Sequence, residues 1–175
     1  MKKIYALLFA LVSLLATATA QAANGDIYGG IGYNFNTLDS GPRLFGGYTF
    51  LKNRWTLANM PVSLGAELTY LDIGTGWVST YVKDKEYGVF ATAVGSMRVA
   101  ENLDVLARVG LGWGRGKETD TLSGITQTST GTEPMIGIGA TYKFQPNLGV
   151  RADLEHYSGE FQSADAVTAS IFASF

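Results

Sequence analysis

Hydrophobic and polar residues alternate with a period of two along most of the chain after residue 26. A period of two places alternate side chains on opposite faces of a β-strand. Between Ile27 and Phe35, for example, Ile31 and Tyr33 lie on one face, whereas Gly32 and Asn34 lie on the other. The pattern predicts eight strands, at residues 27–35, 44–50, 62–70, 87–97, 105–113, 136–144, 148–154 and 167–175.

The two faces of these strands differ as they do in a strand that crosses a lipid bilayer. One face is apolar with aromatic residues near its ends, and the other carries glycine, serine, threonine and charged residues. Each strand has about the 9–11 residues that a tilted strand needs to cross a bilayer. The prolines lie at strand starts or in turns, as backbone pairing in lipid requires. We therefore expect an all-β fold, an eight-stranded antiparallel up-and-down transmembrane barrel. A soluble β-sandwich, whose strands also alternate, is the alternative.

The connections between these strands alternate in length. Short turns are predicted near residues 100–102 and 145–147. Short turns on one side of a barrel and long loops on the other are typical of the outer membrane, where the long loops are extracellular. The connection at residues 51–61 breaks this rule, because it is predicted to be long on the short-turn side. Trp55 in this connection is expected to lie at the membrane interface. The predicted long loops are residues 36–42, 72–86, 115–134 and 157–166.

The first 22 residues have the features of an export signal. Two lysines are followed by an apolar run from Ile4 to Leu15, and Ala20-Gln21-Ala22 fits the small-x-small cleavage pattern. The apolar run is shorter than the roughly 20 residues of a membrane-spanning helix. We expect residues 1–22 to be a Sec signal peptide and residues 23–175 to be the barrel domain.

Composition excludes several other classes of function. The 175 residues include no cysteine and one histidine, and the formal net charge is −2. Without cysteine the chain has no disulfide scaffold and no cysteine-based metal site, and we expect no metal and no cofactor. A net negative charge leaves no basic footprint for nucleic acid, which we do not expect as a partner.

Several segments resemble strands of the OmpA-like transmembrane barrels. The stretches 101–110, 134–144 and 147–157 resemble the fifth, sixth and seventh strands of that family, and residues 44–48 and 65–68 fit the second and third. The resemblance implies a small barrel in the bacterial outer membrane, delivered by the barrel-assembly machinery through its last strand. Ile171 and Phe175 fit the alternating, aromatic-ended signal of that strand, whereas Ala173 stands where the family usually has an aromatic residue.

Charged residues on the inward face predict a network in the lumen. An eight-stranded barrel is just wide enough for its side chains to fill, and an unpaired charge there would be costly. The resemblance implies that such a network gates a passage; a packed, neutralised interior and a narrow pore are the two alternatives. The residues expected in the network are Glu67, Arg108, Lys143, Arg151, Asp153 and Glu155.

A short string near the end of the seventh strand predicts an alternative, enzymatic function. His156-Tyr157-Ser158 resembles a motif of the outer-membrane lipid A deacylases, in which an outward serine and histidine act with an acid on an acyl ester. A serine nucleophile needs a base within reach and an acid that orients the base. Glu160 and Asp165 are the nearby acids, and Glu160 is the candidate third member. The other interpretation is an interfacial histidine at a strand end.

The remaining features predict contacts with the membrane and the cell surface. The outward aromatic residues are expected to form the girdles at the two membrane interfaces. We expect outer-membrane lipids and lipopolysaccharide as partners, and a surface ligand at the loops 72–86 and 115–134. The main expectation is a structural, envelope-integrity or surface-contact role without catalysis. The girdle candidates are Tyr33, Tyr70, Tyr87, Trp113 and Tyr142.

Overall fold

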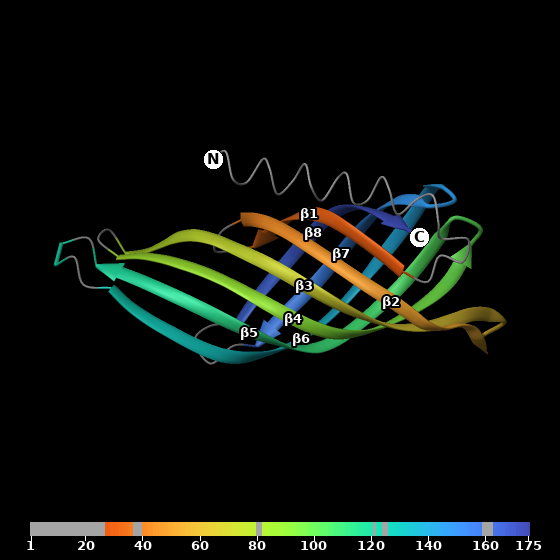
Figure 1. The fold of residues 1–175 in the computed structure, drawn as a ribbon, viewed down its shortest axis with the longest axis horizontal. Coiled ribbons are helices and arrows are strands. Elements are labelled where there is room, and N and C mark those ends of the chain that lie inside the picture. Colours follow the sequence, from red (N-terminus) through yellow and green to blue (C-terminus); the bar gives the residue numbers. More distant parts are fainter. Residues whose placement is uncertain (1–26, 37–39, 80–81, 121, 124–125, 159–162) are drawn as a thin grey trace.

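Eight antiparallel strands close into a barrel, each paired with its neighbours in the chain and the first paired with the last (Figure 1). The structure is a computed structural model that describes residues 27–36, 40–79, 82–120, 122–123, 126–158 and 163–175. The expected signal peptide lies outside the described residues. The strands are β1 (Ile27–Asn36), β2 (Ser40–Leu57), β3 (Met60–Ser79), β4 (Val82–Ala100), β5 (Leu103–Asp120), β6 (Thr126–Gln145), β7 (Leu148–Ser158) and β8 (Ser163–Ser174).

Backbone hydrogen bonds between β1 and β8, the first and last strands, close the ring. The Phe175 N–H donates to the Ile27 carbonyl over 2.7 Å, and the β1–β8 ladder runs from Tyr28 opposite Ser174 to Asn36 opposite Ala166. The predicted barrel is confirmed, and a two-sheet sandwich is wrong, because the ring of paired strands is continuous. No described segment forms a helix long and apolar enough to cross a membrane.

The predicted loops at 72–86 and 115–134 are wrong, because most of these residues continue the strands. Asp72 pairs with Tyr87, and the β4–β5 ladder continues as far as Val82 opposite Asp120. β2 to β6 are therefore 18–20 residues long, rather than 9–11. The outer halves of β3, β4, β5 and β6 form a four-stranded sheet beyond the barrel, at the left of Figure 1. We call this part, residues 72–79, 82–87, 115–120 and 126–134, the sheet extension.

The long connection expected at 51–61 is also wrong. β2 continues to Leu57, which pairs with Met60, so only Ala58 and Asn59 form the turn. Both residues have positive φ, 52° and 64°, as a type I′ turn requires, and this turn matches the twist of the two strands. Two register shifts after Thr49 interrupt the ladder. Such bulges, together with a polar stretch that lacks clear alternation, explain why the pattern fails there.

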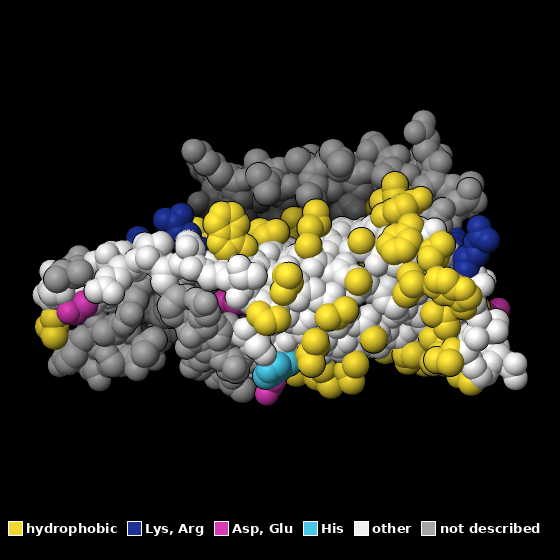
Figure 2. All heavy atoms as spheres, turned by 90° about the horizontal axis from the view of Figure 1, so that it is seen from below, with side chains coloured by type: hydrophobic (Ala, Val, Ile, Leu, Met, Phe, Trp, Pro, Cys, Tyr) yellow, Lys and Arg dark blue, Asp and Glu magenta, His cyan; other side chains and the backbone are white. Residues whose placement is uncertain are grey.

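The outward face of the barrel is apolar over a broad band. Leucine, isoleucine and valine side chains from all parts of the ring remain exposed, and the face shown in Figure 2 carries hydrophobic side chains as a yellow band across the barrel. Lysine and arginine side chains lie beyond both ends of this band (Figure 2). The two-residue turns, the start of β1 and the end of β8 lie at one end of the barrel. In the usual arrangement of outer-membrane barrels this is the periplasmic end. The sheet extension is then extracellular.

Candidate functional site: the lumen and the outer end of β7

Three arginines and three carboxylates fill the middle of the lumen. Their side chains point inward from β2, β3, β5 and β7 because they occupy the inward positions of the alternation. Each of the six residues is at most 4% exposed. With three positive and three negative groups, the layer is formally neutral. We call it the charged cluster; it consists of Arg43, Glu67, Arg108, Arg151, Asp153 and Glu155.

Glu67 lies at the centre of the charged cluster. Its Oε2 accepts a hydrogen bond from Arg151 Nη1 over 2.7 Å, and its Oε1 lies 3.5 Å from Arg43 Nη2. Arg108 also pairs with Glu67, and on its other side with Glu155. One carboxylate thus contacts arginines from three different strands, which ties opposite walls of the barrel together.

The other carboxylates complete the pairing of the arginines. Arg43 Nη1 lies 3.2 Å from Asp153 Oδ2 and 3.0 Å from Glu155 Oε1. Arg151 Nε donates to Asp153 over 2.9 Å. A hydroxyl group also binds one of these carboxylates: Tyr157 Oη donates a hydrogen bond to Glu155 over 2.5 Å. Guanidinium groups suit such a network, since each offers several donors in a fixed plane.

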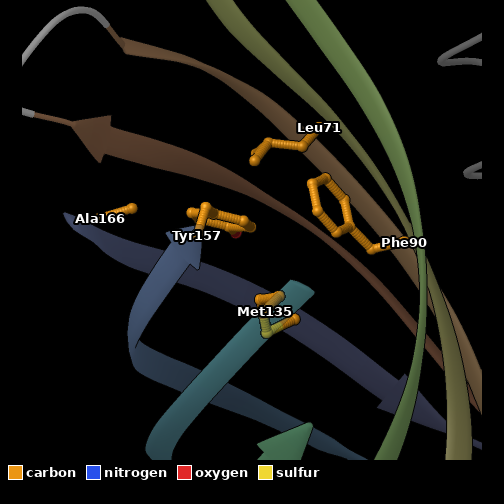
Figure 3. Close-up of a cluster of buried hydrophobic side chains, with 5 residues drawn as sticks. All are labelled: Leu71, Phe90, Met135, Tyr157 and Ala166. Carbon is orange, nitrogen blue, oxygen red and sulfur yellow. The ribbon is translucent and has the colours of Figure 1, made fainter. Parts of the chain in front are cut away.

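An apolar layer covers the extracellular side of the charged cluster. Phe90 and Tyr157 meet edge to face at 5.0 Å between ring centroids. A side chain at Gly112 would collide with Phe90, 2.1 Å from its Cδ1, so the repeated glycines of β5 make room in the lumen. The five side chains point toward one another from different strands (Figure 3), and they are Leu71, Phe90, Met135, Tyr157 and Ala166.

Lys143 does not join the charged cluster, although the sequence predicts it there. It lies nearer the periplasmic turns and lines a cavity of about 100 Å³. Asp104 lines the same cavity and receives a hydrogen bond from Arg98 Nε over 2.9 Å. Val94 and Thr141 also line it, so uncharged side chains at these inward positions leave space beneath the charged cluster.

Arg43 is the member of the charged cluster that the sequence reasoning missed. The inward parity of the second strand indicates it, because Leu44 lies on the outward face. Its place beside Pro42, in a segment interpreted as a loop, hid that signal. The structure shows that Ser40 to Pro42 already belong to β2, where they pair with β1.

The outer end of β7 carries a histidine–carboxylate pair. His156 is directly opposite Asp165 in the β7–β8 ladder, and His156 Nδ1 lies 2.7 Å from Asp165 Oδ1. The His156 side chain is 44% exposed and the Asp165 side chain 80%. Ser158, two residues after His156, is also exposed. Glu160 lies outside the described residues, so the acid that the structure brings to His156 is Asp165.

The remaining candidate residues lie on the outward face or at the end of β8. Tyr33, Tyr70 and Trp113 are exposed near the extracellular end of the barrel, and Tyr142 is exposed near the periplasmic end. Tyr87 is half-buried opposite Arg115. Ile171 is exposed on β8, and Phe175 pairs with Ile27. Among the described residues, no three histidine or acidic side chains are placed to hold a metal ion.

Residues 6–173 match the family model described as outer membrane protein beta-barrel domain. No curated protein matches the sequence. Among solved structures, Ail, the attachment invasion locus protein of Yersinia pestis, has a TM-score of 0.60 at 16% identity, and the match covers 85% of this chain and 96% of Ail. Ail is also known in complex with the heparin analogue sucrose octasulfate.

Two further solved structures show the same fold at similarly low identity. The N-terminal β-barrel domain of Pseudomonas aeruginosa OprF has a TM-score of 0.60 at 13% identity, with coverage of 86% of this chain and 98% of that domain. The outer membrane enzyme PagL has a TM-score of 0.51 at 13% identity, with coverage of 85% and 99%. Similarity at this level concerns the fold, because barrels of one architecture serve different functions.

Proposed function

Because this chain belongs to the outer membrane β-barrel domain family, and so to the bacterial outer membrane, we propose that it anchors the sheet extension as a rigid surface for contact with partners outside the cell. The barrel, surrounded by lipid and with its lumen filled by side chains, also supports the envelope. Delivery by the barrel-assembly machinery through β8 belongs to this proposal.

The observation that carries the proposal is an open edge of the sheet extension, the one along β6. Residues Thr126–Pro134 of β6 pair with β5 on one side, whereas no described strand pairs with them on the other, since the β6–β7 ladder begins at Met135. An open edge presents backbone donors and acceptors to which an extended segment of another protein can add as a strand. Ail, a protein of similar fold, binds a sulfated ligand, which supports a role in surface contact.

A trimmed barrel separates surface contact from envelope support. Residues 73–86 and 116–129 are each replaced by Asn-Gly, which suits a two-residue hairpin turn and closes the strands at Asp72–Tyr87 and Arg115–Thr130. Cells that produce the trimmed barrel should resist detergent as cells with the wild type do. They should no longer adhere to layers of cells or to heparin-coated surfaces. Adhesion that survives the trimming would contradict the surface role; a normal gel shift on heating serves as the control for folding.

A second candidate function rests on the pairing of His156 with Asp165. We infer that Ser158 is the nucleophile of an esterase acting on acyl esters of lipid A in the outer leaflet. His156 would take the serine proton as Ser158 Oγ attacks the ester carbonyl, and would return it to the departing sugar oxygen; water would then release the acyl chain from the serine. The carboxylate of Asp165 holds the imidazole in the orientation this transfer requires.

Mass spectrometry of lipid A tests the second candidate. Cells that produce the wild type should contain lipid A lacking one acyl chain, and Ser158→Ala or Asp165→Asn should restore the full set. Ser123→Ala, a substitution of an exposed serine in the turn between β5 and β6, should keep the activity. Identical lipid A with and without the wild-type protein would exclude the esterase and leave the surface-contact role standing.

A further inference from the structure

The register of β4 and β5 separates the charges of these two strands by sign. Lys117 pairs with Lys85 and Thr119 pairs with Lys83, and Arg115 lies two residues before Lys117. Residues directly opposite each other, and residues two apart in one strand, share a face of the sheet. The four basic residues of these strands thus occupy register positions on one face.

The acidic residues of β4 and β5 occupy register positions on the other face, whereas Asp72 of β3, opposite Tyr87, shares the face of the basic residues. Asp84 pairs with Glu118, Glu86 pairs with Gly116, and Asp120 pairs with Val82. Along the chain the two signs alternate and look like an ordinary solvated loop. Once the strands are paired, their register positions separate by sign. We call the face of Arg115 and Lys117, the basic residues whose side chains the structure describes, the basic face, and the face of Asp120 the acidic face.

The basic face continues the lipid-facing surface of the barrel. Trp113, two residues before Arg115, is 71% exposed and lies on the outward face with Val109 and Leu111. Arg115 and Lys117 are both exposed. Opposite them on β6 are Thr130 and Thr128, which are also exposed and whose hydroxyl groups are potential donors. Figure 2 shows basic side chains directly beyond the apolar band at this end.

The height of the basic face matches the headgroups of the outer leaflet. A strand rises about 3.3 Å per residue, so Arg115 lies roughly 7 Å and Lys117 roughly 13 Å along the strand beyond Trp113. The headgroup layer extends about 5–8 Å beyond the hydrocarbon on each side of a bilayer, and strand tilt reduces the height of both residues above Trp113. Both cations therefore fall at or just above the phosphate level.

We propose that the basic face binds the phosphate groups of lipopolysaccharide in the surrounding leaflet. Arginine binds phosphate through two parallel hydrogen bonds and lysine binds it as a point charge. The face looks sideways over the membrane rather than away from it, which favours a lipid over a soluble anion. The phosphate groups of the leaflet repel the acidic face, so the contact sets the orientation of the sheet. This inference goes beyond the proposed surface contact and does not depend on it.

Binding of purified lipopolysaccharide to the full-length barrel in detergent tests the proposal. The variant Arg115→Glu/Lys117→Glu should bind at least about tenfold more weakly than wild type, which corresponds to about 1.4 kcal/mol. The wild type should lose a similar factor when the lipopolysaccharide is dephosphorylated, and the variant should not. The matched control is Lys52→Glu/Arg54→Glu, which makes the same charge change on exposed residues at the periplasmic end and should bind as wild type does.

Three results would overturn the proposal. They are equal affinity of the Arg115→Glu/Lys117→Glu variant and wild type, equal affinity of the wild type for phosphorylated and dephosphorylated lipid, and a requirement for these residues in binding soluble heparin but not lipopolysaccharide. If the double glutamate variant does not show the gel shift of a folded barrel, Arg115→Gln/Lys117→Gln takes its place. That variant removes the charges without reversing them and should show a smaller loss in the same direction.

Discussion

Glu67 contacts all three arginines of the charged cluster, so its charge balances more partners than any other carboxylate there. Removing one partner of a buried ion pair leaves the other charge uncompensated, which costs about 3–5 kcal/mol. Glu67→Gln should therefore lower the free energy of unfolding by about this amount in urea titrations of the barrel in lipid vesicles. Glu101→Gln, at an exposed turn, should change it by less than about 0.5 kcal/mol. Equal effects of the two substitutions would show that the cluster is not under electrostatic constraint.

Asp120 at the tip of the sheet extension gives a pH-dependent contact outside the membrane. Its carboxylate accepts hydrogen bonds from the Ser123 hydroxyl over 2.7 Å and from the Leu122 N–H over 2.9 Å. These bonds lower the pKa of Asp120, so the contact is complete above the ordinary carboxyl pKa of about 3.9 and is lost as the pH falls through the lowered value. NMR titration should show a higher pKa for Asp120 in Ser123→Ala. The same pKa in both proteins would mean that the hydroxyl does not stabilise the carboxylate.

The β2–β3 hairpin shows how one turn sets the length of two strands. Ala58 adopts a φ of 52°, a region that costs a non-glycine residue roughly 1–2 kcal/mol. Glycine loses more freedom on folding but carries no such cost. Ala58→Gly should raise the free energy of unfolding by about 0.5–1 kcal/mol. Ala100→Gly, beside the β4–β5 turn and outside the positive-φ region, should lower it. A loss of stability in Ala58→Gly would contradict the type I′ turn.

The barrel as a whole is expected to be closed to ions. The charged cluster spans the lumen and the apolar layer of Leu71, Phe90 and Met135 covers it, as fits a barrel of eight strands, whose interior side chains fill. The cavity beneath, about 100 Å³ in volume, ends at Arg151. Planar bilayers containing the wild type should show no steady conductance at either polarity. A stable single-channel current from protein that shows the heat-dependent gel shift would favour the narrow pore.

The period of two along the chain was enough to predict the strand order, the outward apolar face and the antiparallel ring, because lipid requires every backbone group in the ring to be paired. The same pattern placed Glu67, Arg108, Arg151, Asp153 and Glu155 on the inward face. It underestimated the strands, because the sheet extension lies above the membrane in water, where polar residues such as Thr128 and Lys117 can pair as strands without an apolar face.

Alternation along one strand states which face a residue lies on, but not which residues of other strands lie at its height. The pairing register supplies that second coordinate. It brings Arg43, Arg108 and Arg151 to one carboxylate, places Asp165 beside His156, and sets Lys117 opposite Lys85. Within the charged cluster the contacts join residues up to 112 positions apart, as between Arg43 and Glu155. They depend on the closure of the ring, which fixes the stagger and the tilt of the eight strands relative to one another.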